Sequence, residues 1–107
     1  MLKIERSMNT AISGCLDWRQ GNTEVTFSPE SNESHVYLYD RRIASVGEDY
    51  VRLYSGGFRT ATTKSRLNSL LIEHGFQDRV YQRAGCWYVE SEGVVLPFTE
   101  GMTLSGV

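Results

Sequence analysis

The spacing of apolar residues along the chain predicts two helices. A first set recurs at helical intervals and predicts an amphipathic helix over residues 3–17: Ile4, Met8, Ala11, Ile12, Cys15 and Leu16. A second set, Leu67, Leu70, Leu71 and His74, follows the i, i+3, i+4, i+7 pattern and predicts a helix from about Thr63 to His74. Thr62 is the expected N-cap of this helix and Gly75 its C-terminal stop.

Alternating apolar and polar residues predict short strands at 24–27, 35–39, 42–46 and 50–54, and then at 79–82 and 86–89. The turns between the middle strands are short, which favours antiparallel hairpins. Residues 94–98 form a possible last strand, which Pro97 restricts to a sheet edge, and the end from about 99 is expected to be loose. The order α-β-β-β-β-α-β-β indicates one α+β domain over 1–107, a twisted antiparallel sheet with two helices on one face.

The same alternation predicts an aromatic and cationic sheet face. Apolar residues of the middle strands point to one side, and the residues between them point to the other: Tyr37, Tyr39, Arg52 and Tyr54. Exposed aromatic rings beside cations can stack nucleobases or anchor a protein partner. The alternative is that the first helix or the second hairpin covers this face and buries the rings.

The start of the second helix is unusual in its charge. Helices favour acidic residues in the first turn, whereas this one carries Lys64 and Arg66, with Arg59 just upstream. Together with Thr62 and Thr63 these cations form a candidate site for an anion, such as a nucleic-acid phosphate. The alternative is that the basic side chains extend into water and bind nothing.

Composition describes an ordinary globular domain, since the 107 residues are 40% apolar and 22% charged. The sequence contains no run of 18 apolar residues, so no membrane span is predicted. It also shows no secretory signal, so a cytoplasmic protein is expected. The net charge is −2, but residues 41–83 hold eight basic and four acidic residues. This basic segment is compatible with a local contact to an anion, and also with chance clustering.

Few residues predict catalysis. The two cysteines, Cys15 and Cys86, are expected to be buried free thiols, and His35 and His74 lack metal-ligand spacing, so neither metal nor cofactor is expected. No serine lies in a nucleophile elbow, and the glycines before Lys64 lack the phosphate-loop spacing. The sequence therefore predicts a protein that is not an enzyme.

Several segments resemble small proteins of unknown function encoded by tailed bacteriophages. The most specific is residues 57–68, which fits G-[YWF]-x-T-x-T-T-K-x-R-[LM]-N, and residues 80–89 fit V-[FY]-Q…W-[YF]-V. Residues 8–12, 22–25 and 43–44 add to the resemblance. It implies a bacteriophage origin and a place in the cytoplasm of an infected host cell.

The sequence favours two functions, and a minor enzyme or a virion component is a third alternative. The first is a non-catalytic accessory protein that binds nucleic acid or a host nucleoprotein complex. The second is an anti-CRISPR-like inhibitor of a bacterial defence system, which acts through protein contact or by mimicking nucleic acid. A homodimer is compatible with either function.

Overall fold

The computed structural model describes residues 1–105, which form two helices and nine strands. In chain order these are α1 (Lys3–Ser13), β1 (Trp18–Gln20), β2 (Thr23–Ser28), β3 (Glu33–Leu38), β4 (Arg41–Val46), β5 (Tyr50–Leu53), α2 (Ala61–Glu73), β6 (Arg79–Arg83), β7 (Cys86–Ser91), β8 (Val94–Pro97) and β9 (Met102–Ser105). All strand pairs are antiparallel, which confirms the predicted α+β class.

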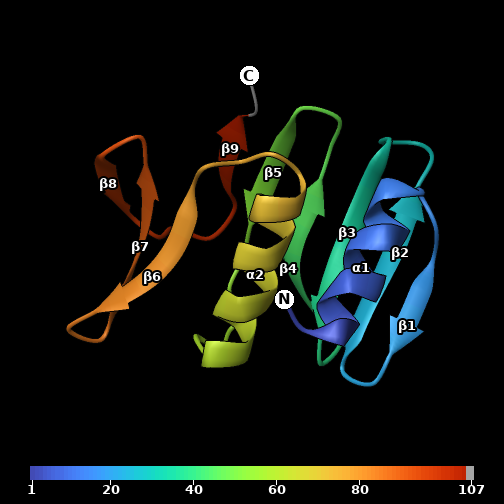
Figure 1. The fold of residues 1–107 in the computed structure, drawn as a ribbon, viewed down its shortest axis with the longest axis horizontal. Coiled ribbons are helices and arrows are strands. Elements are labelled where there is room, and N and C mark those ends of the chain that lie inside the picture. Colours follow the sequence, from blue (N-terminus) through green and yellow to red (C-terminus); the bar gives the residue numbers. More distant parts are fainter. Residues whose placement is uncertain (106–107) are drawn as a thin grey trace.

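The main sheet has six strands in the order β1-β2-β3-β4-β5-β9 (Figure 1). Its two outer strands were not predicted. Residues 18–20 pair with β2, whereas the sequence pattern extended the first helix to residue 17. Residues 102–105, expected to belong to a loose end, pair with the free edge of β5 and bury Leu104.

A separate sheet of three strands, in the order β6-β7-β8, lies beside α2 (Figure 1). The expected edge strand is confirmed as β8, whose four residues are all exposed. The Phe98 N–H donates to the Trp87 carbonyl of β7 (3.0 Å). Since backbone nitrogens of successive strand residues point in opposite directions, the nitrogen of Pro97 points away from β7. Proline therefore removes a hydrogen-bond donor from the open edge of this sheet.

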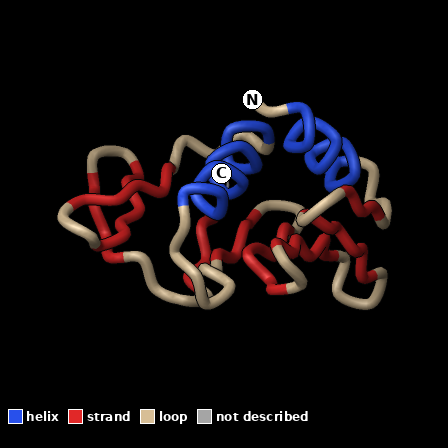
Figure 2. The backbone as a smooth tube through the Cα atoms, turned by 90° about the horizontal axis from the view of Figure 1, so that it is seen from below, coloured by secondary structure: helices blue, strands red, loops and turns tan. Residues whose placement is uncertain are grey.

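Both helices pack on one side of the six-stranded sheet (Figure 2). The predicted stripe on α2 is confirmed, since Leu67, Leu70 and Leu71 are fully buried. They share one core with Met8 of α1 and with strand residues such as Val36. This arrangement leaves the opposite side of the sheet without a helix.

The ends of both helices differ from the prediction. Helix α1 ends at Ser13, and Cys15 follows in the left-handed region (φ 54°), which turns the chain towards β1. Leu16 and Cys15 are consequently exposed, and Cys86 is exposed at the start of β7, so the expectation of buried thiols was wrong. At the start of α2 the N-cap is Thr60, whose side chain accepts the Thr63 N–H (3.2 Å), and Thr62 lies inside the helix.

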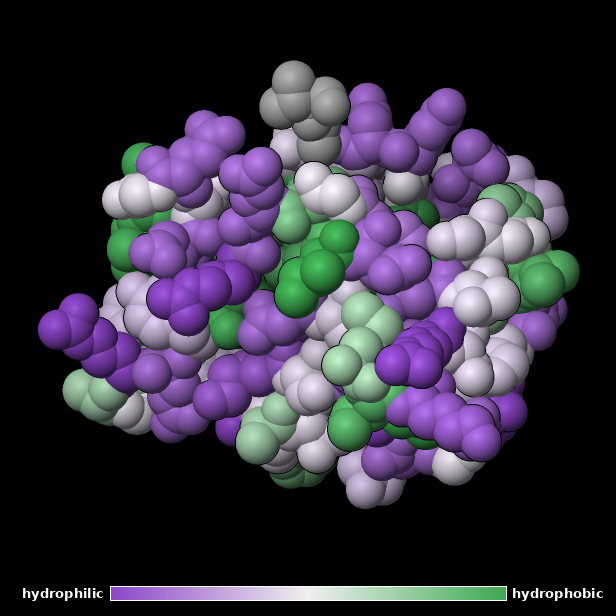
Figure 3. All heavy atoms as spheres, viewed as in Figure 1, coloured by the Kyte–Doolittle hydropathy of each residue, from purple (hydrophilic) through white to green (hydrophobic). Residues whose placement is uncertain are grey.

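The helix side of the surface is mostly hydrophilic, with hydrophobic residues in separate patches (Figure 3). Large continuous apolar patches are typical of docking sites, and this side shows none. Within residues 1–105, neither helix combines the length and hydropathy that crossing a membrane requires.

Candidate functional site

The side of the main sheet away from the helices carries the predicted aromatic and cationic residues. Tyr37, Arg52 and Tyr54 lie there and are each half-buried, as the alternation predicted. Both helices lie on the other side of this sheet (Figure 2), so the first helix does not cover this face. We call this surface the open face; on β3, β4, β5 and the residue after β5 it comprises Glu33, His35, Tyr37, Arg42, Ser45, Tyr50, Arg52 and Tyr54, and Glu24 and Thr26 of β2 lie on the same side, opposite Tyr37 and His35.

Two arginines lie over tyrosine rings on the open face. The Arg42 guanidinium is 5.7 Å from the Tyr54 ring centroid, and the Arg52 guanidinium is 5.4 Å from that of Tyr50. Among residues 1–105, Arg42 has no carboxylate within ion-pair distance, whereas Arg52 bonds Glu33 (3.2 Å). Such cation–π pairs hold the rings and guanidinium groups in a shared aromatic and cationic surface.

Arg42 and Tyr50 were missed by the sequence prediction, for different reasons. Tyr50 alternates with Arg52, so the pattern itself could have included it. Arg42 could not be found in this way, because the register between β3 and β4 shifts after Val36 and sets Tyr37 opposite Arg42. A β-bulge of this kind interrupts the alternation on which the prediction rests.

A polar network lies at the base of the open face around Glu33. The Tyr50 hydroxyl donates to this carboxylate, which also accepts from Arg52. The bond from Tyr50 lowers the pKa of Glu33, against the opposing effect of burial. Burial and the positive charge of Arg42 lower the pKa of His35, so at neutral pH Glu33 is ionised and His35 is neutral.

In the network, a serine contacts a histidine, which in turn lies beside a carboxylate. Ser45 Oγ is 2.9 Å from His35 Nδ1, and His35 Nε2 is 4.0 Å from Glu33. Hydrolases use the same three groups, but their nucleophile must reach a substrate. Ser45 is fully buried between paired strands. The arrangement therefore supports the sheet and gives no support to attack by Ser45.

The residues of the predicted anion site do not come together. Arg66 points into the protein, where it is 4% exposed and pairs with Glu5 of α1 at 2.9 Å. It also donates to Thr23 of β2 (3.1 Å). Its counter-ion is therefore Glu5, in place of the external anion that the sequence predicted, because residue 66 lies on the side of α2 that packs against α1.

Arg59 and Lys64 face the small sheet. Their charged groups lie 5.8 and 5.9 Å from the Trp87 ring centroid. Arg59 pairs with Glu100 at 3.8 Å, and Lys64 donates to Gln82 at 3.0 Å. Both cations thus point away from Thr62 and Thr63.

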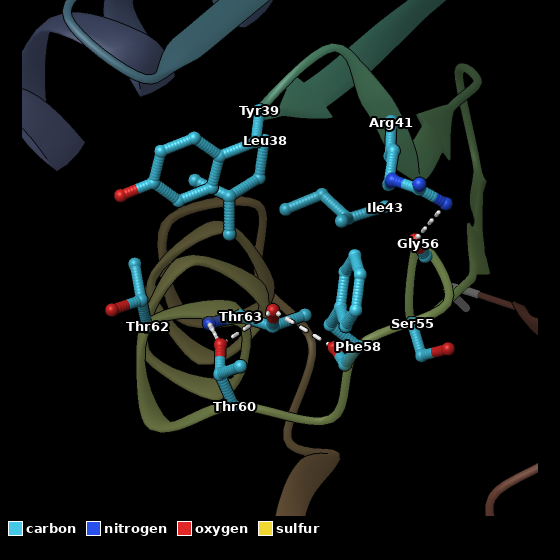
Figure 4. A pocket seen from close by; sticks show the side chains of 10 residues that line it. All are labelled: Leu38, Tyr39, Arg41, Ile43, Ser55, Gly56, Phe58, Thr60, Thr62 and Thr63. Carbon is cyan, nitrogen blue, oxygen red and sulfur yellow. Dashed lines mark hydrogen bonds between the residues drawn. The ribbon is translucent and has the colours of Figure 1, made fainter.

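Thr62 and Thr63 line a pocket with Tyr39 between the start of α2 and the β3–β4 turn (Figure 4). We call it the α2 pocket; its volume is about 330 Å³, and its walls are Leu38, Tyr39, Arg41, Ile43, Ser55, Gly56, Phe58, Thr60, Thr62 and Thr63. Tyr39 reaches it because residues 39 and 40 form a turn with positive φ (51° and 62°), which takes its ring off the open face. The prediction that Tyr39 shares a face with Tyr37 was therefore wrong.

Two aromatic side chains stand exposed at the α2 pocket, Tyr39 at 69% and Phe58 at 60%. The Arg41 guanidinium lies 4.8 Å from the Phe58 ring centroid and donates to the Gly56 carbonyl (3.4 Å). Arg41 and Phe58 were not predicted as site residues, since the predicted strand began at residue 42 and Phe58 lies between the predicted strand and helix. Only the loop after β5 brings them together.

The fold and these surfaces define a small α+β protein with a half-buried aromatic and cationic sheet face that no helix covers. In the part of the chain that the structure describes, no three His, Cys, Asp or Glu side chains gather into a group able to hold a metal ion. The chain belongs to the Kyanoviridae Gp96 protein family, whose model matches residues 1–105. The bacteriophage origin implied by the sequence is thereby confirmed, while no curated protein and no solved structure matches the chain.

Proposed function

We propose that this phage protein is an accessory protein that binds single-stranded nucleic acid on the open face. One observation carries the proposal: tyrosine rings and arginines lie together, with Arg42 over Tyr54 and Arg52 over Tyr50, on a sheet face that no helix covers. Base stacking on aromatic residues contributes roughly 1–3 kcal/mol per base and tolerates any sequence.

The charge of the open face favours a single strand over a duplex. Arg52 is already paired with Glu33, which leaves Arg42 as its arginine without a carboxylate partner within residues 1–105. Duplex binding relies on many phosphate contacts and depends steeply on salt. A surface with rings and few free cations instead suits unpaired bases, whose faces are available for stacking.

The test is binding of a fluorescently labelled DNA or RNA strand of about 15 nucleotides, near the upper end of common site sizes for such surfaces. Fluorescence anisotropy should give saturable binding to single strands and weaker binding to a duplex. Tyr54→Ala and Tyr37→Ala should each weaken the affinity by about 5- to 150-fold. Ile72→Ala is a matched control, because Ile72 is 69% exposed on α2, on the other side of the molecule.

Two results would contradict the proposal. One is the lack of saturable binding to any single strand by the folded wild-type protein. The other is binding that Tyr37→Ala and Tyr54→Ala leave unchanged.

Because Arg42 is the main free cation of the open face, Arg42→Ala should also make the affinity less sensitive to salt.

A further inference from the structure

We infer that the α2 pocket receives a single unpaired nucleobase of the strand bound to the open face. The inference rests on the proposed function and adds a site with a defined occupant. It draws on the walls of the pocket, its charge, its size and its position at the end of the open face.

The walls of the pocket suit a flat aromatic group. Leu38 and Ile43 form an apolar floor and are almost fully buried. Tyr39 and Phe58 project from opposite sides of the opening (Figure 4), and Arg41 lies over the Phe58 ring. Unpaired bases are commonly held in this way, against aromatic rings and the plane of an arginine.

The charge of the pocket suits a ligand with a phosphate backbone. Its ten lining residues include Arg41 and no acidic residue. The nearest acid in sequence, Asp40, pairs with Arg19 at 3.3 Å and does not line the pocket. An anionic backbone at the opening therefore meets a guanidinium group and hydroxyls, such as that of Thr62, with no carboxylate in the lining.

The size of the pocket limits its occupant. A volume of about 330 Å³ is close to the lower end of ligand pockets, roughly 300–1,000 Å³. One base fits a space of this size, whereas stacked base pairs of a duplex do not. The pocket is thus selective for a base that has been turned out of a strand.

The pocket continues the open face around one end of the sheet. In the β3–β4 hairpin, the open-face pair Tyr37 and Arg42 is followed directly by the pair Leu38 and Arg41, which lines the pocket. Ser55 of the pocket likewise follows Tyr54 of the open face. Because successive strand residues point to opposite sides, Leu38 and the pocket lie on the other side of the sheet from Tyr37, and a strand bound to the open face enters the pocket by passing around the β3–β4 turn.

The experiment compares two probes on the wild type and on variants of the pocket. The probes are a single DNA strand of about 15 nucleotides and the same sugar–phosphate backbone without bases. The proteins are the wild type, Phe58→Ala, and Tyr39→Asn, since asparagine tolerates the positive φ at position 39 and removes the ring. Phe58→Trp tests rescue by another ring, and Ile72→Ala is the control.

Each pocket variant should lose about 5- to 150-fold in affinity for the DNA strand, and Phe58→Trp should restore it. Affinity for the baseless backbone should not change, since the lost contact is with a base. Phe58 and Tyr39 are exposed, so both variants should remain folded, as circular dichroism would verify.

Three other results would overturn the inference, and they have different meanings. If the wild type binds no strand, the proposed function fails together with the pocket. If Tyr54→Ala weakens binding and the pocket variants do not, the proposed function stands and the pocket inference fails. If the pocket variants weaken binding to both probes equally, the pocket holds backbone and no base.

Discussion

The ion pair between Glu5 and Arg66 is predicted to be essential to the fold. It is 2.9 Å long, and both side chains are at most 5% exposed. Arg66 also bonds Thr23, and Ser65 donates to Glu5 (2.6 Å), so the pair joins α1, α2 and β2. Removal of the arginine leaves the Glu5 carboxylate buried without its counter-ion.

Arg66→Met should therefore destabilise the protein by about 3–5 kcal/mol, the usual cost of breaking a buried pair on one side. The total free energy of unfolding of a domain of this length is about 5–15 kcal/mol. The melting temperature should fall by about 4–8 °C for each kcal/mol lost. Lys64→Met also replaces a cation by methionine, but Lys64 is less buried than Arg66. This variant should lose about 0.5 kcal/mol of stability or less.

Denaturant unfolding followed by circular dichroism measures both variants. The double change Glu5→Leu with Arg66→Met should cost less than Arg66→Met alone, because it leaves no unpaired buried charge. Arg66→Glu places a second carboxylate beside Glu5 and should prevent folding. A loss below about 1 kcal/mol for Arg66→Met would refute this account.

Three further predictions follow from the core, the histidines and the thiols. Leu70→Ala should lower the free energy of unfolding by about 2–5 kcal/mol in denaturant unfolding, since Leu70 is fully buried. Ile72→Ala, on the exposed side of the same helix, should lower it by under about 0.5 kcal/mol. Equal losses would mean that the helix face is misassigned. Burial lowers the pKa of His35 and His74 in the folded protein, so protons bind preferentially to the unfolded chain, and stability should fall as the pH drops below about 6.5. Melting temperatures between about pH 7 and 5 would show this, and His35→Gln should flatten the decline; a flat wild-type profile would contradict it. Both cysteines are free and exposed, so both should react with Ellman's reagent in the native protein, and protection until denaturation would show that they are buried.

The pattern of apolar residues was sufficient to predict the helices, most strands and the fold class. Leu67, Leu70 and Leu71 repeat at a period that only a helix can bury on one side, and Val36 and Val51 alternate with polar residues at a period that only a strand can. These signals are local, so the pattern is sufficient to detect them. Tyr37, Arg52 and Tyr54 were placed on one face for the same reason.

The directions of the charged and turn residues depend on contacts between distant parts of the chain. The partner of Arg66 is 61 residues away in sequence, and no local pattern links it to Glu5. The bulge beside Val36 and the positive φ of Tyr39 each depend on how β3 pairs with β4, and they moved Arg42 onto the open face and Tyr39 off it. Periodicity fixes which side of an element is apolar, whereas the contacts of a polar side chain depend on which distant elements pack against it.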